Sequence, residues 1–98
     1  MKVYPIFVSE RAEQNLEKII LYLEEEWSES VKKAFLKELN FNFERIGLMP
    51  CIFPKSEKFE NLRKGLITKH ANIFYQVFDD YIEIVTIQDT RQNPDFLK

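Results

Sequence analysis

Two helical patterns joined by a very short connection constrain this fold more than any other feature. The first follows Ser9, a candidate N-cap, and its apolar residues recur at helical spacing: Ala12, Leu16, Ile19, Ile20, Leu23 and Trp27. The second follows Ser28, ends near Gly47 and carries a similar stripe: Val31, Ala34, Phe35, Leu39, Phe43 and Ile46. Because so little chain separates them, we expect the helices to fold back on each other as an antiparallel hairpin.

Strand-like runs lie on both sides of this helical pair. Residues 3–8 are β-branched and aromatic, and Pro5 confines such a strand to an edge or a bulge. A loop over 50–61 leads to three more runs separated by short turns, which predict an antiparallel meander: 62–69, 72–78 and 81–88. We therefore expect one α+β domain over residues 1–98, of order β-α-α-β-β-β. Its helical hairpin should pack on one face of a small, mainly antiparallel sheet.

The composition excludes several classes of protein. Hydrophobic residues make up 45% and charged residues 31% of the chain, a balance typical of a folded domain and not of a disordered one. No apolar run approaches the roughly 18 residues of a membrane span, and the first residues lack the pattern of a signal peptide. The single cysteine, Cys51, excludes an internal disulfide framework. We expect a cytoplasmic protein without a membrane segment.

Metal and cofactor sites are not expected either. One histidine, His70, and one cysteine are too few for a dedicated zinc site, and the chain has no glycine-rich phosphate loop. Cys51 and His70 could form a nucleophile pair, but their spacing does not support one, and Cys51 is better interpreted as a small buried filler. Tyr75 is interpreted as a core residue whose hydroxyl is bonded at the rim.

Basic residues gather in one part of a slightly acidic chain. The net charge of −2 provides no global field that would attract nucleic acid. Between residues 55 and 70, however, five basic residues outnumber two acidic ones: Lys55, Lys58, Arg63, Lys64 and Lys69 against Glu57 and Glu60. This segment could contact phosphates, or it could be the solvated surface of loops and strands.

Three residues are candidates for chemistry on a phosphate. Arg63 at the start of a strand could offer a rigid planar fork to a phosphate, or could form a salt bridge. Arg91, just after the last predicted strand, raises the same alternatives, and the two arginines together could stabilise charge on a phosphoryl group. His70 could transfer a proton near neutral pH, although a solvent-exposed turn histidine is the simpler interpretation.

Several segments, in this order, resemble RelE/ParE-type toxins of type II toxin–antitoxin systems, a group that includes plasmid-stabilisation proteins. The similarity covers nearly the whole chain and lies in these segments: 9–16, 19–23, Phe35 to Ile46, Leu62-Arg63, 69–75 and 90–94. It implies a growth-inhibiting toxin held inactive by a cognate antitoxin. The antitoxin of such systems typically wraps an extended or helical segment around the toxin, and Phe41, an apolar residue off the main helical stripe, would be a natural docking position.

The resemblance implies two mechanisms. ParE-like members inhibit DNA gyrase and are not nucleases, whereas RelE-like members cut messenger RNA on the ribosome. Asn72 stands where nuclease members often carry an arginine, and the C-terminal residues offer no tyrosine or histidine as an acid. These departures, together with the net charge of −2, favour gyrase inhibition.

Two alternatives remain open at this point. In the first, the chain is a ribosome-dependent endoribonuclease in which Arg63, Lys69 and Arg91 act with Lys55 or His70 in proton transfer. In the second, it is a degenerate, non-toxic module that keeps only the ability to bind the antitoxin.

Overall fold

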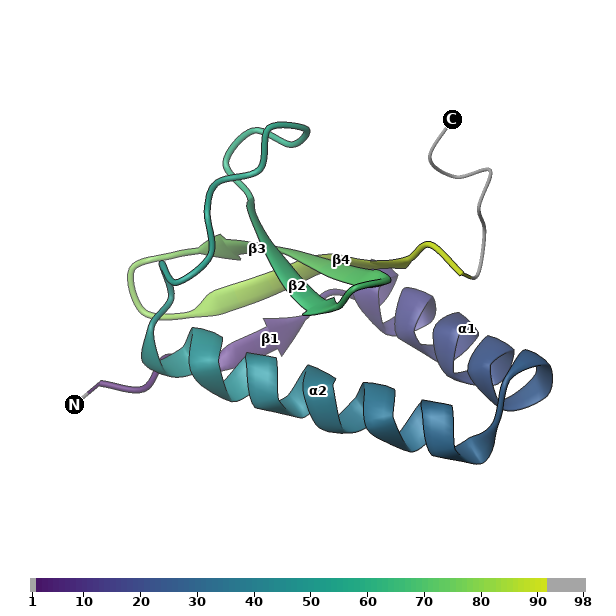
Figure 1. The fold of residues 1–98 in the computed structure, drawn as a ribbon. Coiled ribbons are helices and arrows are strands. Elements are labelled where there is room, and N and C mark those ends of the chain that lie inside the picture. Colours follow the sequence, from purple (N-terminus) through teal and green to yellow (C-terminus); the bar gives the residue numbers. More distant parts are fainter. Residues whose placement is uncertain (1, 92–98) are drawn as a thin grey trace.

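A four-stranded sheet with two helices on one face forms the fold of the computed structural model, which describes residues 2–91 (Figure 1). The elements follow one another along the chain as β1 (Ile6–Val8), α1 (Glu10–Glu26), α2 (Glu29–Leu48), β2 (Arg63–Thr68), β3 (Ala71–Val77) and β4 (Ile82–Asp89). The strand order is β1-β4-β3-β2; β1 runs parallel to β4, and the other neighbours are antiparallel. The predicted α+β fold is confirmed. Within residues 2–91 neither helix is long and apolar enough to cross a membrane.

Both predicted helix caps are present. The Ala12 N–H donates to the Ser9 hydroxyl oxygen at 3.0 Å, and the Val31 N–H donates to that of Ser28 at 3.2 Å. Each bond satisfies a backbone donor that a helix start otherwise leaves unpaired. The chain reverses between the helices at Trp27 and Ser28, so that α2 runs back beneath the sheet (Figure 1).

The core lies between the helical hairpin and the inner face of the sheet. Its largest fully buried side chains come from both layers: Ile19, Leu23, Phe35, Ile46, Ile73, Tyr75, Ile82 and Ile84. Two residues predicted to belong to the apolar helix faces do not pack in the core. Ala34 is exposed, and Trp27 lies beyond the end of α1 with 53% of its surface exposed. The burial of Asn42 was not predicted; its side-chain amide donates to the Glu38 carbonyl at 2.8 Å.

The first strand is shorter than predicted. Only Ile6–Val8 pairs with β4, and Tyr4 instead donates its N–H to the Gly47 carbonyl of α2 at 2.9 Å. The prediction from Pro5 that this strand lies at an edge is confirmed.

β4 extends beyond the end of β1, and side chains at the start of α1 form hydrogen bonds with this remaining part of β4. The Ser9 hydroxyl donates to the Val85 carbonyl at 2.8 Å. The side-chain oxygen of Asn15 accepts the Ile87 N–H at 3.2 Å and the Thr86 hydroxyl at 2.8 Å. On this side, α1 therefore replaces the strand that β1 is too short to supply.

Candidate functional site

Arg63 begins β2 and anchors the loop that precedes it. It lies directly opposite Tyr75 of β3, and side chains of directly paired residues point to the same face of a sheet. Tyr75 is fully buried against the helices, so Arg63 also starts on the helix side. Its guanidinium donates to the Phe53 carbonyl at 2.8 Å. This bond holds the 49–62 loop, the segment between α2 and β2.

Tyr75 binds the same loop from the core side. Its hydroxyl donates to the Pro50 carbonyl at 2.8 Å, so the expectation of a core tyrosine with a bonded hydroxyl is confirmed. Burial raises the pKa of Tyr75 above its usual value, and the Phe53 backbone and the charge of Arg63 only partly oppose that effect. The phenol therefore stays protonated at neutral pH and serves as a donor.

The 49–62 loop also pairs with the outer edge of β2. Lys64 donates its N–H to the Pro54 carbonyl at 3.0 Å, and Ser56 donates its N–H to the Leu62 carbonyl at 2.7 Å. The ring of Phe59 then packs edge-on against Phe74, on the sheet face opposite the helices, with ring centroids 5.0 Å apart. The loop thus covers both an edge and part of a face.

Two other sequence candidates lie in or near this loop. The backbone of Lys55 forms an isolated antiparallel β-bridge with that of Arg63, and Lys55 is exposed. Cys51 is also exposed, so its interpretation as a buried filler is wrong. Its neighbours Ile52 and Phe53 pack against the core instead, and a residue-type argument based on cysteine cannot detect which residues of the loop do so.

Arg91 is held by an acid of its own chain. Its guanidinium contacts both carboxylate oxygens of Asp89, at 2.8 and 3.2 Å, and the Asp89 side chain is fully buried. The same guanidinium lies over the Trp27 ring, 5.5 Å from its centroid. The sequence analysis gave Arg91 two possible roles, phosphate binding and a salt bridge. In the part of the chain that the structure describes, Arg91 forms the salt bridge.

Lys69 and His70 form the turn between β2 and β3. The His70 carbonyl accepts the N–H and the hydroxyl of Thr90, at 2.9 and 3.2 Å, so this turn lies beside the end of β4. Lys69 is exposed and His70 is half-buried. The structure therefore brings Lys69, His70 and Arg91 to one end of the sheet.

Arg63 lies at the other end. Its partner on β3 is Tyr75, whereas Asp89, next to Arg91, pairs with Ala71. Four residues of strand separate these two positions on β3, or about 13 Å. Arg63 and Arg91 do not converge.

The face of the sheet opposite the helices carries few charged groups. By cross-strand pairing its residues include Phe7, Lys64, Leu66, Asn72, Phe74, Gln76, Glu83 and Gln88. Among the described strand residues of this face the charged side chains are Lys64 and Glu83, on strands separated by β3, and thus about 10 Å apart or more. At this distance Lys64 and Glu83 cannot act on one phosphate together, one as the cation that binds it and the other as the proton-transfer group. The 49–62 loop adds Lys58, whose ammonium lies 5.2 Å from the centroid of the Phe59 ring.

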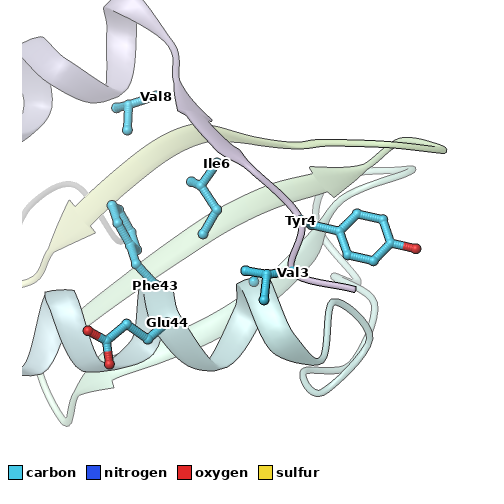
Figure 2. Close-up of a pocket in the computed structure, with 7 residues that line it drawn as sticks. Val3, Tyr4, Ile6, Val8, Phe43 and Glu44 are labelled. Atoms are coloured by element: carbon cyan, nitrogen blue, oxygen red, sulfur yellow. The ribbon is translucent and has the colours of Figure 1, made fainter. Parts of the chain in front are cut away.

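An apolar groove lies between β1 and α2, and the sequence analysis did not identify it. It has a volume of about 300 Å³ and is lined by Val3, Tyr4, Ile6, Val8, Phe43, Glu44 and Gly47. Figure 2 shows Ile6 and Val8 of β1 facing Phe43 of α2, whereas the Tyr4 ring points away. The edge strand predicted from Pro5 was the signal that could have indicated it.

Phe41, the docking position suggested by the resemblance, does not line this groove. Its side chain is 53% exposed on α2, and the Arg45 guanidinium lies 5.5 Å from its ring centroid. The groove and Phe41 are thus separate apolar features of the same helix.

Comparisons with known proteins agree with the fold. Residues 6–94 match the family model described as the ParE toxin of the parDE type II toxin–antitoxin system. A chromosomal ParDE toxin–antitoxin system from P. aeruginosa is similar, with a TM-score of 0.72, 15% identity and coverage of 89% of this chain and 96% of that one. A mutant of the E. coli toxin RelE in the free state gives a TM-score of 0.62, 16% identity and coverage of 97% of this chain and 92% of that one.

A third similar structure is the E. coli DinJ-YafQ complex, with a TM-score of 0.59, 9% identity and coverage of 92% of this chain and 97% of that chain. No curated protein sequence matches the chain. At these identities the structural similarities establish the fold.

Proposed function

Because the chain belongs to the ParE toxin family of type II toxin–antitoxin systems, we propose that it arrests growth by binding DNA gyrase and is not a ribonuclease. The observation that carries this proposal is the separation of its cationic candidates. Arg63 and Arg91 lie at opposite ends of the sheet, and each guanidinium is bonded within the chain. Lys69 and His70 share one end of the sheet with Arg91, but the Arg91 guanidinium is held by Asp89, and Arg63 lies at the other end. RNA cleavage requires available cations and a proton-transfer group around one phosphate, so this arrangement favours binding over catalysis.

We further propose that a cognate antitoxin neutralises the chain. Structurally similar toxins are found in a ParDE system and in the DinJ-YafQ complex. In this proposal the antitoxin binds the folded toxin through apolar surface that the toxin leaves exposed.

The test combines one assay of gyrase with one of messenger RNA. Purified chain is added to gyrase, relaxed plasmid and ATP, and negative supercoiling is followed on gels. In parallel, the 5′ ends of transcripts are mapped shortly after induction of the chain alone. We expect supercoiling to be lost and messages to stay intact. Cuts at codon-spaced positions in translated messages would instead establish the ribosome-dependent nuclease, and unaffected growth would indicate the non-toxic module.

The variant Lys69→Ala/His70→Ala tests the nuclease candidates without disturbing the core. The Lys69 side chain is exposed, and the bonds of His70 that the structure contains are made by its backbone. Gyrase inhibition and growth arrest should therefore persist in this variant. Loss of toxicity with unchanged folding would contradict the proposal.

A further inference from the structure

We propose that Trp27, at the turn between α1 and α2, is the centre of the surface through which the chain binds a positively charged surface of DNA gyrase. This inference rests on the proposed function and names the part of the chain that would contact the target. It is derived from the contact between Trp27 and Arg91 and from the charge around the turn.

Trp27 is a large apolar side chain that the fold leaves outside its core. It directly follows α1, 53% of its surface is exposed, and its backbone N–H donates to the Leu23 carbonyl at 3.1 Å. That backbone bond needs no tryptophan, so the helix end does not explain the exposed indole. Tryptophan is enriched among the residues that dominate the affinity of protein–protein contacts.

Neighbouring groups hold the indole in place. The Arg91 guanidinium lies 5.5 Å from the centroid of the Trp27 ring, and Asp89 fixes that guanidinium with contacts of 2.8 and 3.2 Å. The Asp89 side chain is fully buried, and that of Arg91 is 14% exposed. An exposed aromatic ring that is already held in position loses little conformational freedom when a partner covers it.

The turn is the most acidic part of the chain. Residues 24–32 contain four glutamates and one lysine, for a charge of −3, whereas the whole chain carries −2. The remaining residues therefore carry a net charge of +1. Figure 1 shows this turn at the end of the molecule opposite the N-terminus.

Folding alone does not favour so many glutamates here. Glu24, Glu25 and Glu26 are the last three residues of α1, where the partial negative charge of the helix end opposes carboxylates, and the last turn contains no basic residue. Lys32 binds Glu24 and Glu29, at 2.7 and 2.9 Å. Glu25 and Glu26 are exposed and form no ion pair with another described residue. The charge is thus available to a partner.

Charge complementarity identifies the kind of partner. An enzyme that acts on DNA binds its phosphates through a positively charged surface. An exposed indole beside unpaired carboxylates complements such a surface, with the ring at the centre of the contact and the carboxylates at its rim. A second copy would bring two acidic turns together, and DNA itself would be repelled.

The first test replaces the indole and follows gyrase supercoiling. For Trp27→Ala, the concentration of chain that halves supercoiling should rise by about tenfold or more. Trp27→Phe keeps a ring beside Arg91 and should lose less. Phe41→Ala is the matched control, because Phe41 is also 53% exposed and has the Arg45 guanidinium 5.5 Å from its ring centroid. It should inhibit like the native chain, and circular dichroism checks the fold of each variant.

The second test removes the charge. Glu25→Gln/Glu26→Gln should weaken the Kd for gyrase by roughly three- to fivefold at low salt, and the difference should shrink as salt is added. Glu57→Gln/Glu60→Gln makes the same change of net charge in the 49–62 loop and should leave the Kd unchanged. All four residues are exposed, so neither variant should unfold the chain.

Three results would overturn the inference. They are equal inhibition by the native chain and Trp27→Ala, equal effects of the two double variants, and a Trp27→Ala variant that inhibits gyrase normally but no longer binds the product of the small reading frame adjacent to its own. The last result would make the turn an antitoxin contact. A native chain without effect on gyrase would overturn the proposed function, and this inference with it, before any variant is compared.

Discussion

The two edges of the sheet differ in what covers them. At β2, the 49–62 loop of the same chain bonds to the edge through Lys64 and is held by Arg63 and Tyr75. At β1, a single backbone bond at Tyr4 is followed by outward peptide groups and an apolar groove. Exposed strand edges favour association with other chains, and proteins usually cover or charge them. The difference indicates that the β2 edge belongs to the fold, whereas the β1 edge is available to a partner.

The largest expected effect is at the covered edge. A Cβ on Gly65 would lie 2.9 Å from the Phe53 ring and 3.1 Å from Ile73, so Gly65→Ala should displace the loop from β2 and lower the free energy of unfolding by about 1–3 kcal/mol. Urea denaturation followed by circular dichroism measures this change.

Gly47→Ala is the matched substitution near the open edge. Its Cβ would come within 3.3 Å of the Tyr4 carbonyl, but alanine also favours the helix, so the net change should stay within about 1 kcal/mol. Equal losses in the two variants would show that the two edges do not differ in packing.

The next largest effect is expected where α1 replaces the missing part of β1. Asn15→Ala removes the acceptor of the Ile87 N–H and of the Thr86 hydroxyl, and should lower the free energy of unfolding by about 1–2 kcal/mol. Asn15→Asp retains a side-chain acceptor and should be close to the native chain. Thermal unfolding of the three proteins distinguishes a lost hydrogen bond from a general intolerance of substitution at this position.

A smaller, pH-dependent effect is expected from the hydroxyl under the loop. Tyr75→Phe removes the bond to the Pro50 carbonyl and should cost about 0.5–1.5 kcal/mol at neutral pH. Because burial raises the pKa of Tyr75 in the folded state, the unfolded chain loses this proton first as pH rises above about 10. The stability of the native chain should therefore fall in that range, and its advantage over Tyr75→Phe should shrink. A difference that stays constant between pH 8 and pH 11 would contradict the assigned role.

The smallest effect on stability is expected at the open edge itself. Phe7 is 57% exposed, with its ring 5.6 Å from that of Tyr81, and Phe7→Lys should change the free energy of unfolding by about 0.5 kcal/mol or less. A charge on an edge strand opposes pairing with other chains, so any self-association that the native chain shows in sedimentation runs should be weaker in this variant. The same charge at Leu66, on the covered edge, should alter self-association less.

Local sequence patterns were sufficient for the elements and their order. The caps Ser9 and Ser28 and the apolar spacing between them predicted both helices, because these signals act within one or two turns of chain. Trp27, Ala34 and Cys51 were misassigned because burial depends on which surface an element meets, and residue type alone does not specify that.

The candidate site depended far more on the tertiary structure. Sequence reasoning selected Arg63 and Arg91 as possible partners, but strand register places them at opposite ends of the sheet and bonds each to an acceptor of its own chain. The predicted motifs at 92–94 lie outside the described residues.

The sequence by itself determined the α+β fold, the helical pair, the edge position of the first strand and the family resemblance. Each of these rests on short-range periodicity, capping or the order of segments along the chain. Only the tertiary structure decided which edge stays open, which side the 49–62 loop covers and where a groove forms. These features arise from contacts between residues far apart in the chain, such as Tyr4 with Gly47 and Asn15 with Ile87, and no local pattern encodes such contacts.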